Sequence, residues 1–473
     1  MSQTRPIDEH SMHTRTCGEL RRENVGEEVT LTGWVSRRRD HGGLIFCDLR
    51  DREGITQLTF DPEHSDGDAF KIAETMRPEW PIKIHGVVRA RGEETTNAKL
   101  ATGEVEVLTD HAEVLNTSVT PPFQIEDGIE TSEDTRLRYR YLDLRRPEMM
   151  ANLKLRSDFT FAIREALHNR EFMEVETPVL SPIAGGANAR PFITHHNTLD
   201  IDMYMRIATE LHLKRLIVGG LERVYEVGRI FRNEGMDTKH NPEFTTCELY
   251  QAFTNLDGMM DILEGILAGA AKEILGTYQL QWLGHDIDLT PSWKRVTMAD
   301  AVKEVTGADF MAIEGDNDAA VALAKSVGVD MDGVDKTWGN ALYETFDQKV
   351  EETLIQPTFI TMYPVEVSPL AKRSPSDPHL TERYEMFVCG CEMGNAFTEL
   401  NDPMDQYERF KAQVEKRANG DDEAEMMDED YVMALEYGLP PTGGLGFGID
   451  RCAMMLCGTD SIRDVILFPT MRP

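Results

Sequence analysis

The sequence lacks the features that mark a membrane or secreted protein. No uninterrupted apolar run approaches the roughly 18 residues that a membrane span needs. Residues 1–9 do not show the basic, apolar and small-residue succession of a secretory signal. We therefore expect a cytoplasmic location and no membrane partner. The chain also has no internal repeat, so a repeat or fibrous protein is not expected.

Cysteine is scarce, and positive charge is in short supply. The seven cysteines are scattered without any C-x-x-C pair, which favours neither a disulfide framework nor a zinc site and fits a reducing compartment. Lysine and arginine number 49 against 83 acidic residues, and the resulting charge of −34 would repel RNA. We interpret most of this excess, including the acidic run at residues 421–430, as solvated surface. Any RNA contact must then be local, with Arg21, Arg22 and residues 37–39 as candidates.

The first part of the chain is patterned as short strands. These strands predict a small β-barrel. Barrels of this kind often bind single-stranded nucleic acid through an aromatic platform. Phe46 would stack on a base and Gln57 would read a base edge, although a core position for Phe46 and a solvated one for Gln57 are open alternatives. The strands expected in this small Greek-key barrel of the OB type lie at residues 29–35, 43–48, 55–60, 82–89 and 104–108.

The 473 residues, 41% of them hydrophobic, have room for two or three domains. We predict domains at residues 1–117 and 146–473, joined by a linker at 118–145. Beyond the linker, helices are expected at residues 147–170, 256–275 and 449–456, strands at 172–178, 358–363, 383–398 and 443–448, and a small helical insertion at about 293–350.

Residues 224–250 are the most informative stretch. They read as two strands joined by a polar loop that contains His240, with Arg232 and Glu234 ending the first strand. In the second strand, alternation places Phe244, Glu248 and Tyr250 on one face. An aromatic ring, a carboxylate and a phenol in a row make a poor half of a hydrophobic core. They predict one wall of a pocket for something flat and something cationic.

Several charged residues fit a nucleoside triphosphate. Arg232 and Arg451 supply guanidinium forks for phosphate oxygens, and His240 adds a third donor. Glu385 and Glu392 supply the oxygen ligands that Mg²⁺ prefers. Because residues seven apart on a regular strand face opposite sides, both glutamates can reach one ion only if the strand bulges or turns, and we expect that bulge or turn at Gly390.

Other acids indicate a cationic substrate. Asn395 and Glu399 are four residues apart and would share a face, and with Glu248 they would place two carboxylates in one cavity. Two buried carboxylates repel each other unless a cation joins them. A substrate that ends in an ammonium group would supply that cation. An exposed position for any one of these glutamates remains open.

The motifs together resemble a known family. Phe231-Arg-Asn-Glu234 with residues 240–244 is similar to motif 2 of the class II aminoacyl-tRNA synthetases, residues 443–451 resemble motif 3, and the segment ending at Pro178 resembles motif 1. Residues 182–216, 363–369 and 467–473 look like the lysyl branch of that class, whereas residues 33–54, 100–104 and 141–147 look closer to the aspartyl branch. The resemblance implies an α+β chain with an OB-type barrel and a catalytic domain built on an antiparallel sheet flanked by helices.

The resemblance also implies an activity. Lysine would be activated with ATP and Mg²⁺ and transferred to tRNA(Lys) by a homodimer. The roles that it implies are catalysis for Arg232 and Arg451; ATP binding for Arg232, Glu234, His240, Asn241, Phe244, Glu385, Glu392 and Arg451; Mg²⁺ for Glu385 and Glu392; lysine binding for Gly186, Glu210, Glu248, Tyr250, Asn395, Glu399 and Gly448; and the anticodon for Arg37, Phe46 and Gln57.

Three alternatives stay open on the sequence. Aspartate activation, or a hybrid with altered tRNA choice, is supported only by the N-terminal part. A protein lysylator would lack the barrel. A catalytically inactive RNA-binding relative would not need Arg232 and Arg451. Cys391, which stands where arginine is common, and Thr246-Cys247, which replace larger residues, bear on the level of activity.

Overall fold

The computed structural model describes residues 10–421 and 423–472. Residues 1–9, where no secretory signal is predicted, therefore lie outside the described part. The chain divides into two compact units at the bond between Ala151 and Asn152. This boundary falls within helix α4 (Pro147–His168), which ends two residues before its predicted end.

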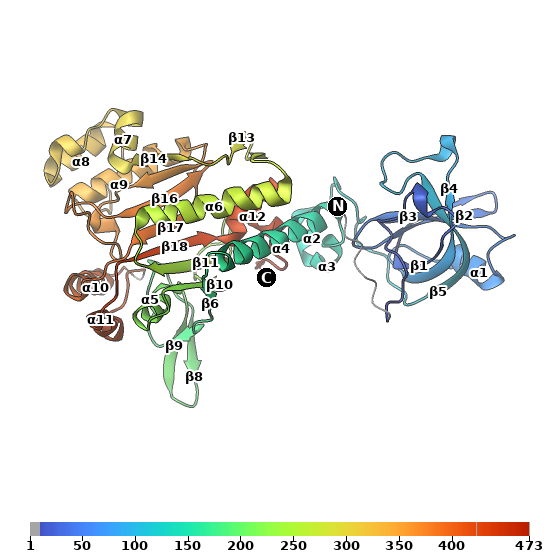
Figure 1. Ribbon diagram of the computed structural model, residues 1–473, viewed down its shortest axis with the longest axis horizontal. Coiled ribbons are helices and arrows are strands. Elements are labelled where there is room, and N and C mark those ends of the chain that lie inside the picture. Colours follow the sequence, from blue (N-terminus) through green and yellow to red (C-terminus); the bar gives the residue numbers. More distant parts are fainter. Residues whose placement is uncertain (1–9, 422, 473) are drawn as a thin grey trace. The chain divides into compact units, whose positions relative to one another are not determined.

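The first unit is a closed five-stranded barrel, which confirms the predicted OB-type fold (Figure 1). Alternate residues such as Ile82, Ile84 and Val88 point inward and form its core. The barrel order is β1-β2-β3-β5-β4, with β1 (Glu28–His41), β2 (Leu44–Arg50), β3 (Ile55–Phe60), β4 (Pro81–Ala90) and β5 (Val105–Val114). Helix α1 (Gly67–Thr75) packs on β5, and α2 (Glu133–Arg138) and α3 (Arg140–Asp143) follow the barrel.

The second unit is built on an eight-stranded sheet. Most neighbouring strands are antiparallel, as the family resemblance implied, but the outermost pair at each end of the sheet runs parallel, so the sheet is mixed. The sheet order is β14 (Lys294–Thr297), β15 (Thr358–Thr361), β16 (Arg383–Val388), β17 (Cys391–Thr398), β18 (Thr442–Gly448), β11 (Glu243–Ala252), β10 (Arg223–Phe231) and β6 (Met173–Glu174).

The strand predicted at residues 172–178 is much shorter than expected. Only Met173 and Glu174 pair with β10. Beyond them the Thr177 backbone N–H donates to the Glu226 carboxylate at 2.9 Å instead of a neighbouring strand. Pro178 then offers no N–H at all, so the ladder cannot continue.

Helices cover both faces of the sheet. On one face α4, α6 (Leu256–Leu275) and α12 (Ile449–Cys457) pack into the largest apolar core, and Figure 1 shows α6 crossing β17 and β18. On the other face lie α5 (Glu210–Val218), α10 (Pro403–Ala418) and α11 (Glu429–Glu436). The inserted segment has its own core and contains α7 (Met298–Thr306), α8 (Asn317–Ser326) and α9 (Trp338–Lys349).

Two smaller sheets complete the unit: β7 (Leu180–Ser181), β9 (Ile201–Met205) and β8 (Ile193–His196) form one, and β12 (Gln279–Trp282) with β13 (His285–Asp288) forms the other. All seven cysteines are free, and five are buried. Within residues 10–421 and 423–472, no helix has both the length and the apolar character needed to cross a bilayer.

Candidate active site

The central strands of the sheet enclose a cavity of about 490 Å³. Its walls come from β11, β16, β17 and β18, together with the loop between β10 and β11, the start of α5 and the segments around residues 186 and 425. Of the residues predicted for the nucleotide and the amino acid, the cavity is lined by Gly186, Glu210, Arg232, Glu234, His240, Asn241, Phe244, Glu248, Tyr250, Glu385, Glu392, Asn395, Gly448 and Arg451. Glu399 is the one predicted residue that is not part of the lining.

One end of the cavity carries two guanidinium groups. Arg232 lies over the Phe244 ring, with its Cζ atom 5.2 Å from the ring centroid. Arg451, in the first turn of α12, donates to the Glu392 backbone carbonyl. The preceding Asp450 fixes this helix start, because it accepts from the Thr245 N–H at 2.7 Å. An aromatic face and two fixed cations suit a purine base and its phosphates.

His240 and Asn241 lie at the rim with polar partners of their own. The His240 Nδ1 atom is 2.9 Å from Asp237 Oδ2. The Asn241 amide donates to the Glu243 carbonyl at 2.7 Å and accepts from the Thr470 N–H at 3.1 Å. Asn241 therefore holds the loop against the C-terminal segment. His240 is exposed, and its Nε2 atom is the ring nitrogen that remains for a ligand.

Glu385 and Glu392 lie on two antiparallel strands, so the strand segment predicted at 383–398 is divided by a turn at the expected position, Gly390. The chain reverses at Cys389 and Gly390, which both have positive φ. A register shift between Met386 and Phe387 then turns Glu392 toward the cavity. The expected irregularity at Gly390 is thus a hairpin turn, with a bulge beside it.

Glu385 is oriented by two neighbours that the sequence did not single out. Arg383 donates to Glu385 Oε1 at 2.5 Å, and the Tyr363 hydroxyl donates to Oε2 at 2.8 Å. Burial raises the pKa of Glu385, and the adjacent Arg383 opposes that rise. Arg383 also donates to the Asn395 side chain at 3.2 Å, so one guanidinium positions two cavity residues.

The other end of the cavity is acidic, and it contains a buried lysine that sequence reasoning missed. Lys214 is fully buried on α5, one turn after Glu210, with Nζ 2.5 Å from Glu210 Oε1. It also pairs with Glu399. Burial lowers the pKa of Lys214, but Glu210 and Glu399 outweigh burial and raise it above the ordinary value. Lys214 is therefore a fixed cation.

Glu399 lies behind the cavity wall. It is fully buried, and a Cβ atom placed on Gly444 would stand 2.0 Å from its Oε1 atom. Among the described residues, Glu399 Oε1 accepts no hydrogen bond. Burial raises the pKa of Glu399 to about 8 despite the neighbouring Lys214. Because Gly444 has no side chain, the Glu399 carboxylate can lie directly against this lining strand of the cavity.

Two further buried carboxylates face the cavity. Glu248 accepts from the Thr209 N–H at 3.3 Å, and burial raises its pKa to about 7. Glu425 is 2% exposed and accepts from the Gly186 N–H at 3.1 Å. Burial raises the pKa of Glu425 to about 8. With Glu210 and Glu399, four buried carboxylates thus lie at the acidic end, and Lys214 pairs with two of them, Glu210 and Glu399.

The interpretation of residues 421–430 as solvated surface is wrong for two of its acids. Glu425 and Asp428 are buried, at 2% and 6% exposure. Asp428 caps α11 and pairs with Arg215 at 2.9 Å, which turns the segment back onto the sheet. The sequence showed only a run of like charges, and which members of the run point inward is decided by this tertiary pairing.

The barrel holds the predicted anticodon residues in different settings. Gln57 is buried, so the solvated alternative for it is wrong: its amide donates to Glu106 at 2.6 Å and accepts from Arg39 at 3.2 Å. Phe46 is half-buried against the edge of the His41 ring, at 5.9 Å between centroids. Arg37 is exposed. The strand face therefore presents the Phe46 ring and the exposed Arg37 side chain beside a network of hydrogen bonds.

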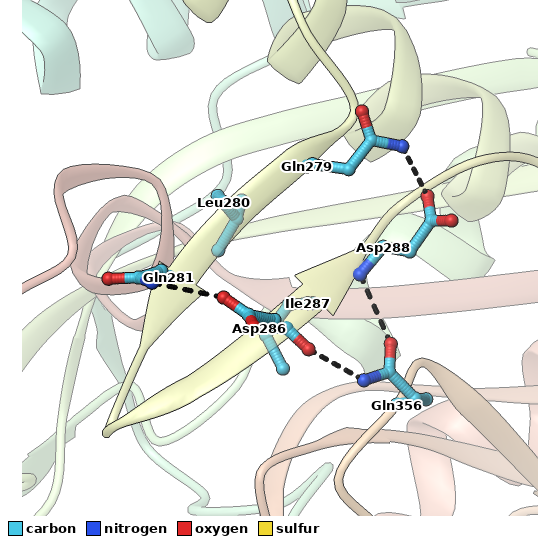
Figure 2. Close-up of a pocket in the computed structure, with 7 residues that line it drawn as sticks. All are labelled: Gln279, Leu280, Gln281, Asp286, Ile287, Asp288 and Gln356. Carbon is cyan, nitrogen blue, oxygen red and sulfur yellow. Dashed lines mark hydrogen bonds between the residues drawn. The ribbon is translucent and has the colours of Figure 1, made fainter.

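A second hollow, of about 590 Å³, lies at the β12–β13 hairpin. Figure 2 shows that its polar side chains bond to one another: Gln279 donates to Asp288 at 3.1 Å, and Gln281 donates to Asp286 at 3.0 Å. Gln356 ties the hairpin to the segment before β15. The polar groups of this hollow are used in hydrogen bonds that join structural elements. The smaller central cavity is therefore the better candidate for the active site.

Comparison with known proteins agrees with this site. A family model described as tRNA synthetases class II (D, K and N) matches residues 132–472, and one described as OB-fold nucleic acid binding domain matches residues 29–115. The lysine–tRNA ligase of Moorella thermoacetica is 50% identical over 453 residues, which cover 95% of this chain and 90% of that protein.

Two further relatives are also lysine–tRNA ligases, with similar identity and coverage. The lysine–tRNA ligase of Thermoanaerobacter sp. (strain X514) is 49% identical, with 95% of this chain and 88% of that protein covered. For the Bacillus subtilis lysine–tRNA ligase the identity is 48%, with 96% and 89% covered. Matches of this extent include the barrel as well as the second unit.

Proposed function

The chain belongs to the class II tRNA synthetases, and from this premise we propose that it is a lysine–tRNA ligase. It would join lysine to tRNA(Lys) in two steps, with ATP as the second substrate. The lysine carboxylate attacks the α-phosphorus of ATP, the bond to the β-phosphate breaks, and pyrophosphate leaves. A terminal ribose hydroxyl of the tRNA then attacks the carbonyl carbon of lysyl-adenylate, and AMP leaves.

We propose that the guanidinium end of the cavity binds ATP. Phe244 and Arg451 would enclose the adenine ring, and Arg232 would meet the α-phosphate, where negative charge develops during attack. Its position over Phe244 supports this role, because stacking fixes the guanidinium before substrate arrives. Glu234, His240 and Asn241 lie at the rim, where the rest of the nucleotide would extend.

We propose Glu385 and Glu392 as the residues that would hold Mg²⁺. Their hard oxygen donors line the same cavity on adjacent strands, which fits this ion. Bound there, Mg²⁺ would neutralise triphosphate charge. We expect Glu392→Gln to raise the Mg²⁺ concentration that gives half-maximal pyrophosphate exchange, while the affinity for lysine stays the same.

The observation that carries lysine as the substrate is the excess of buried carboxylates over buried cations at the acidic end. Buried carboxylates without a counter-ion are costly, and a diamino acid would supply two ammonium groups. We propose that Glu248, Tyr250, Asn395 and Glu399 recognise the ε-ammonium group. Glu210 and the Gly186 backbone would receive the α-ammonium group, and Gly448 would leave room for the substrate.

We further propose that residues 1–117 bind the anticodon through Arg37, Phe46 and Gln57. Residues 118–145 would link them to the catalytic domain at residues 146–473. The protein would work in the cytoplasm, where its substrates are.

We also propose a homodimer. Support comes from apolar side chains left exposed around motif 1, with Phe161 at 65%, Met173 at 54% and Leu180 at 45% exposure. Light scattering that gave a monomer mass at micromolar concentration would contradict the dimer.

The decisive experiment is pyrophosphate exchange with lysine and with aspartate, followed by aminoacylation of purified tRNA(Lys) and tRNA(Asp). We expect exchange with lysine alone and charging of tRNA(Lys). Exchange that depends on aspartate would refute the proposal. ATP binding without any exchange would favour the inactive RNA-binding alternative.

A further inference from the structure

Glu425 lies where no motif placed a functional residue. It belongs to the segment between α10 and α11, yet it is buried and lines the central cavity. Its Oε1 atom accepts from the Gly186 N–H at 3.1 Å. Its Oε2 atom has no hydrogen-bond partner in the part of the chain that the structure describes. An unpaired, buried carboxylate oxygen at a cavity wall needs a donor, and a bound ligand can provide it.

The segment that carries Glu425 is held from both sides. Arg417 donates to the Ala424 carbonyl at 2.9 Å, and Arg215 pairs with Asp428 at 2.9 Å. Met426 packs on the small apolar cluster that includes Ala184. These contacts on both sides of Glu425 hold its backbone in place, and so they position its side chain at the cavity wall.

The neighbouring Glu210 cannot by itself fully neutralise the charge of a substrate cation. Its Oε1 atom is already 2.5 Å from Lys214 Nζ, so part of its charge is neutralised by the protein. Glu425 is close enough to Glu210 and Lys214 for both to influence its ionisation. Gly186 lies between the two glutamates, with the Glu210 Cβ atom 3.3 Å from the position that a Gly186 Cβ atom would take. Gly186, Glu210 and Glu425 thus form one wall.

Tyr250 belongs to a different wall, and Glu399 lies behind that wall. Both lie close to Gly444, and Glu399 is the more deeply buried of the acids, with no exposed surface. The substrate carboxylate must reach the nucleotide beside Arg232, so the distal ammonium group enters the deepest part of the cavity. The ammonium group next to the reacting carboxylate then faces the wall that contains Glu425.

From this geometry we propose that Glu425 is a binding residue for the α-ammonium group of the substrate, acting with Glu210. The inference rests on the proposed lysine activation and adds a residue to that site. Burial raises the pKa of Glu425 to about 8, and an adjacent ammonium group favours the ionised form, so substrate binding and ionisation support each other. Hydrogen bonds between charged partners of this kind are among the stronger ones in proteins.

The test compares lysine with 6-aminohexanoate, which is lysine without its α-amino group, in pyrophosphate exchange. Glu425→Gln keeps the size of the side chain and an oxygen that can accept from Gly186, but it removes the charge. We expect the KM for lysine to rise by about 10- to 100-fold. The inhibition constant of 6-aminohexanoate and the KM for ATP should change by less than about threefold, since neither ligand offers an α-ammonium group.

Glu423→Gln is the matched control, because Glu423 is an exposed acid of the same segment. It should leave all three constants unchanged. Glu425→Asp, which keeps the charge but shortens the side chain, is the second variant if Glu425→Gln does not fold. It too should raise the KM for lysine more than the inhibition constant of 6-aminohexanoate or the KM for ATP.

Two results would overturn the inference. An equal loss for lysine and 6-aminohexanoate would mean that Glu425 merely supports the segment around Gly186. No loss for lysine would mean that it does not face the substrate. Both outcomes differ from failure of the proposed function, in which the unaltered protein itself would show no exchange with lysine.

Discussion

At the scale of single residues, the acidic end of the cavity makes lysine binding depend on pH. The pKa of Glu248 is about 7, and those of Glu399 and Glu425 are about 8, all raised by burial. Their ionised forms attract the substrate cation. We therefore expect the affinity for lysine to increase several-fold from pH 6 to pH 8.5, measured by calorimetric titration, with a shallower dependence in Glu248→Gln. A flat profile would contradict the assignment.

The same pKa shifts predict how the empty protein responds to pH. A carboxyl group whose folded-state pKa lies above its unfolded value stabilises the fold below the unfolded pKa, and that stability is lost as pH rises through the folded pKa. For Glu248, a shift from 4.5 to about 7 corresponds to ~3 kcal/mol. We expect the melting temperature without lysine to fall between pH 6 and 8.5, and saturating lysine to restore most of that loss. Thermal unfolding monitored by fluorescence at both pH values would check this.

Arg232 gives a prediction about the nucleotide end. Arg232→Lys keeps the charge but loses both the planar fork and the stacking on Phe244. We expect kcat/KM for ATP in pyrophosphate exchange to fall by about 100-fold. Arg229→Lys, an exposed position three residues earlier, near the end of β10, is the control and should be neutral. Similar losses in both variants would show that the effect comes from a disturbed β10 and not from the site.

At the scale of elements, β18 sets the shape of the cavity. A Cβ atom on Gly444 would stand 2.0 Å from Glu399 Oε1 and 2.4 Å from Tyr250 Cε1, whereas a Cβ atom on Gly446 would lie 3.4 Å from Glu248 Cγ. We expect Gly444→Ala to abolish measurable lysine activation and Gly446→Ala to retain it. Pyrophosphate exchange over a range of lysine concentrations measures both. Equal activity of the two variants would place Glu399 outside the lysine site.

The elements also show how far sequence reasoning reaches. Strand β3 and helix α6 lie where their patterns predicted, because periodicity and turn residues are local signals. Motif residues such as Arg232 and Arg451 could be found because their types and order carry specific chemistry. The spacing of Glu385 and Glu392 also indicated a bulge or turn at Gly390, but it could not decide between the two, because that choice depends on how the strands pair in the sheet.

Lys214 and Glu425 mark the limit of that reasoning. A lysine on an amphipathic helix and a glutamate in an acidic run both read as solvated, because such side chains usually are. Their burial follows from partners far away in sequence: Glu399 for Lys214, and Gly186 for Glu425. Only the folded chain brings these partners together.

At the scale of the whole molecule, two units with separate cores predict separate responses to ligands. The barrel core, which includes Leu31, contains only residues of the first unit, and the cavity is lined only by residues of the second. In differential scanning calorimetry, we expect lysine with ATP to raise only the transition of the second unit. Leu31→Ala should lower only the transition of the barrel, by the few kcal/mol that loss of a buried leucine costs, about 2–5. A single transition that both changes move would contradict this independence.

The glycines of β18 have a further, entropic consequence. Gly444, Gly446 and Gly448 offer peptide groups to the cavity, so these three positions of the wall have no rotamers that a ligand must freeze. Immobilising a flexible side chain at an interface costs roughly 0.5–1.5 kcal/mol, and a wall of bare backbone avoids that cost. Its contour is set by the ladder to β11 and β17 and should stay nearly the same whether the cavity is empty or full.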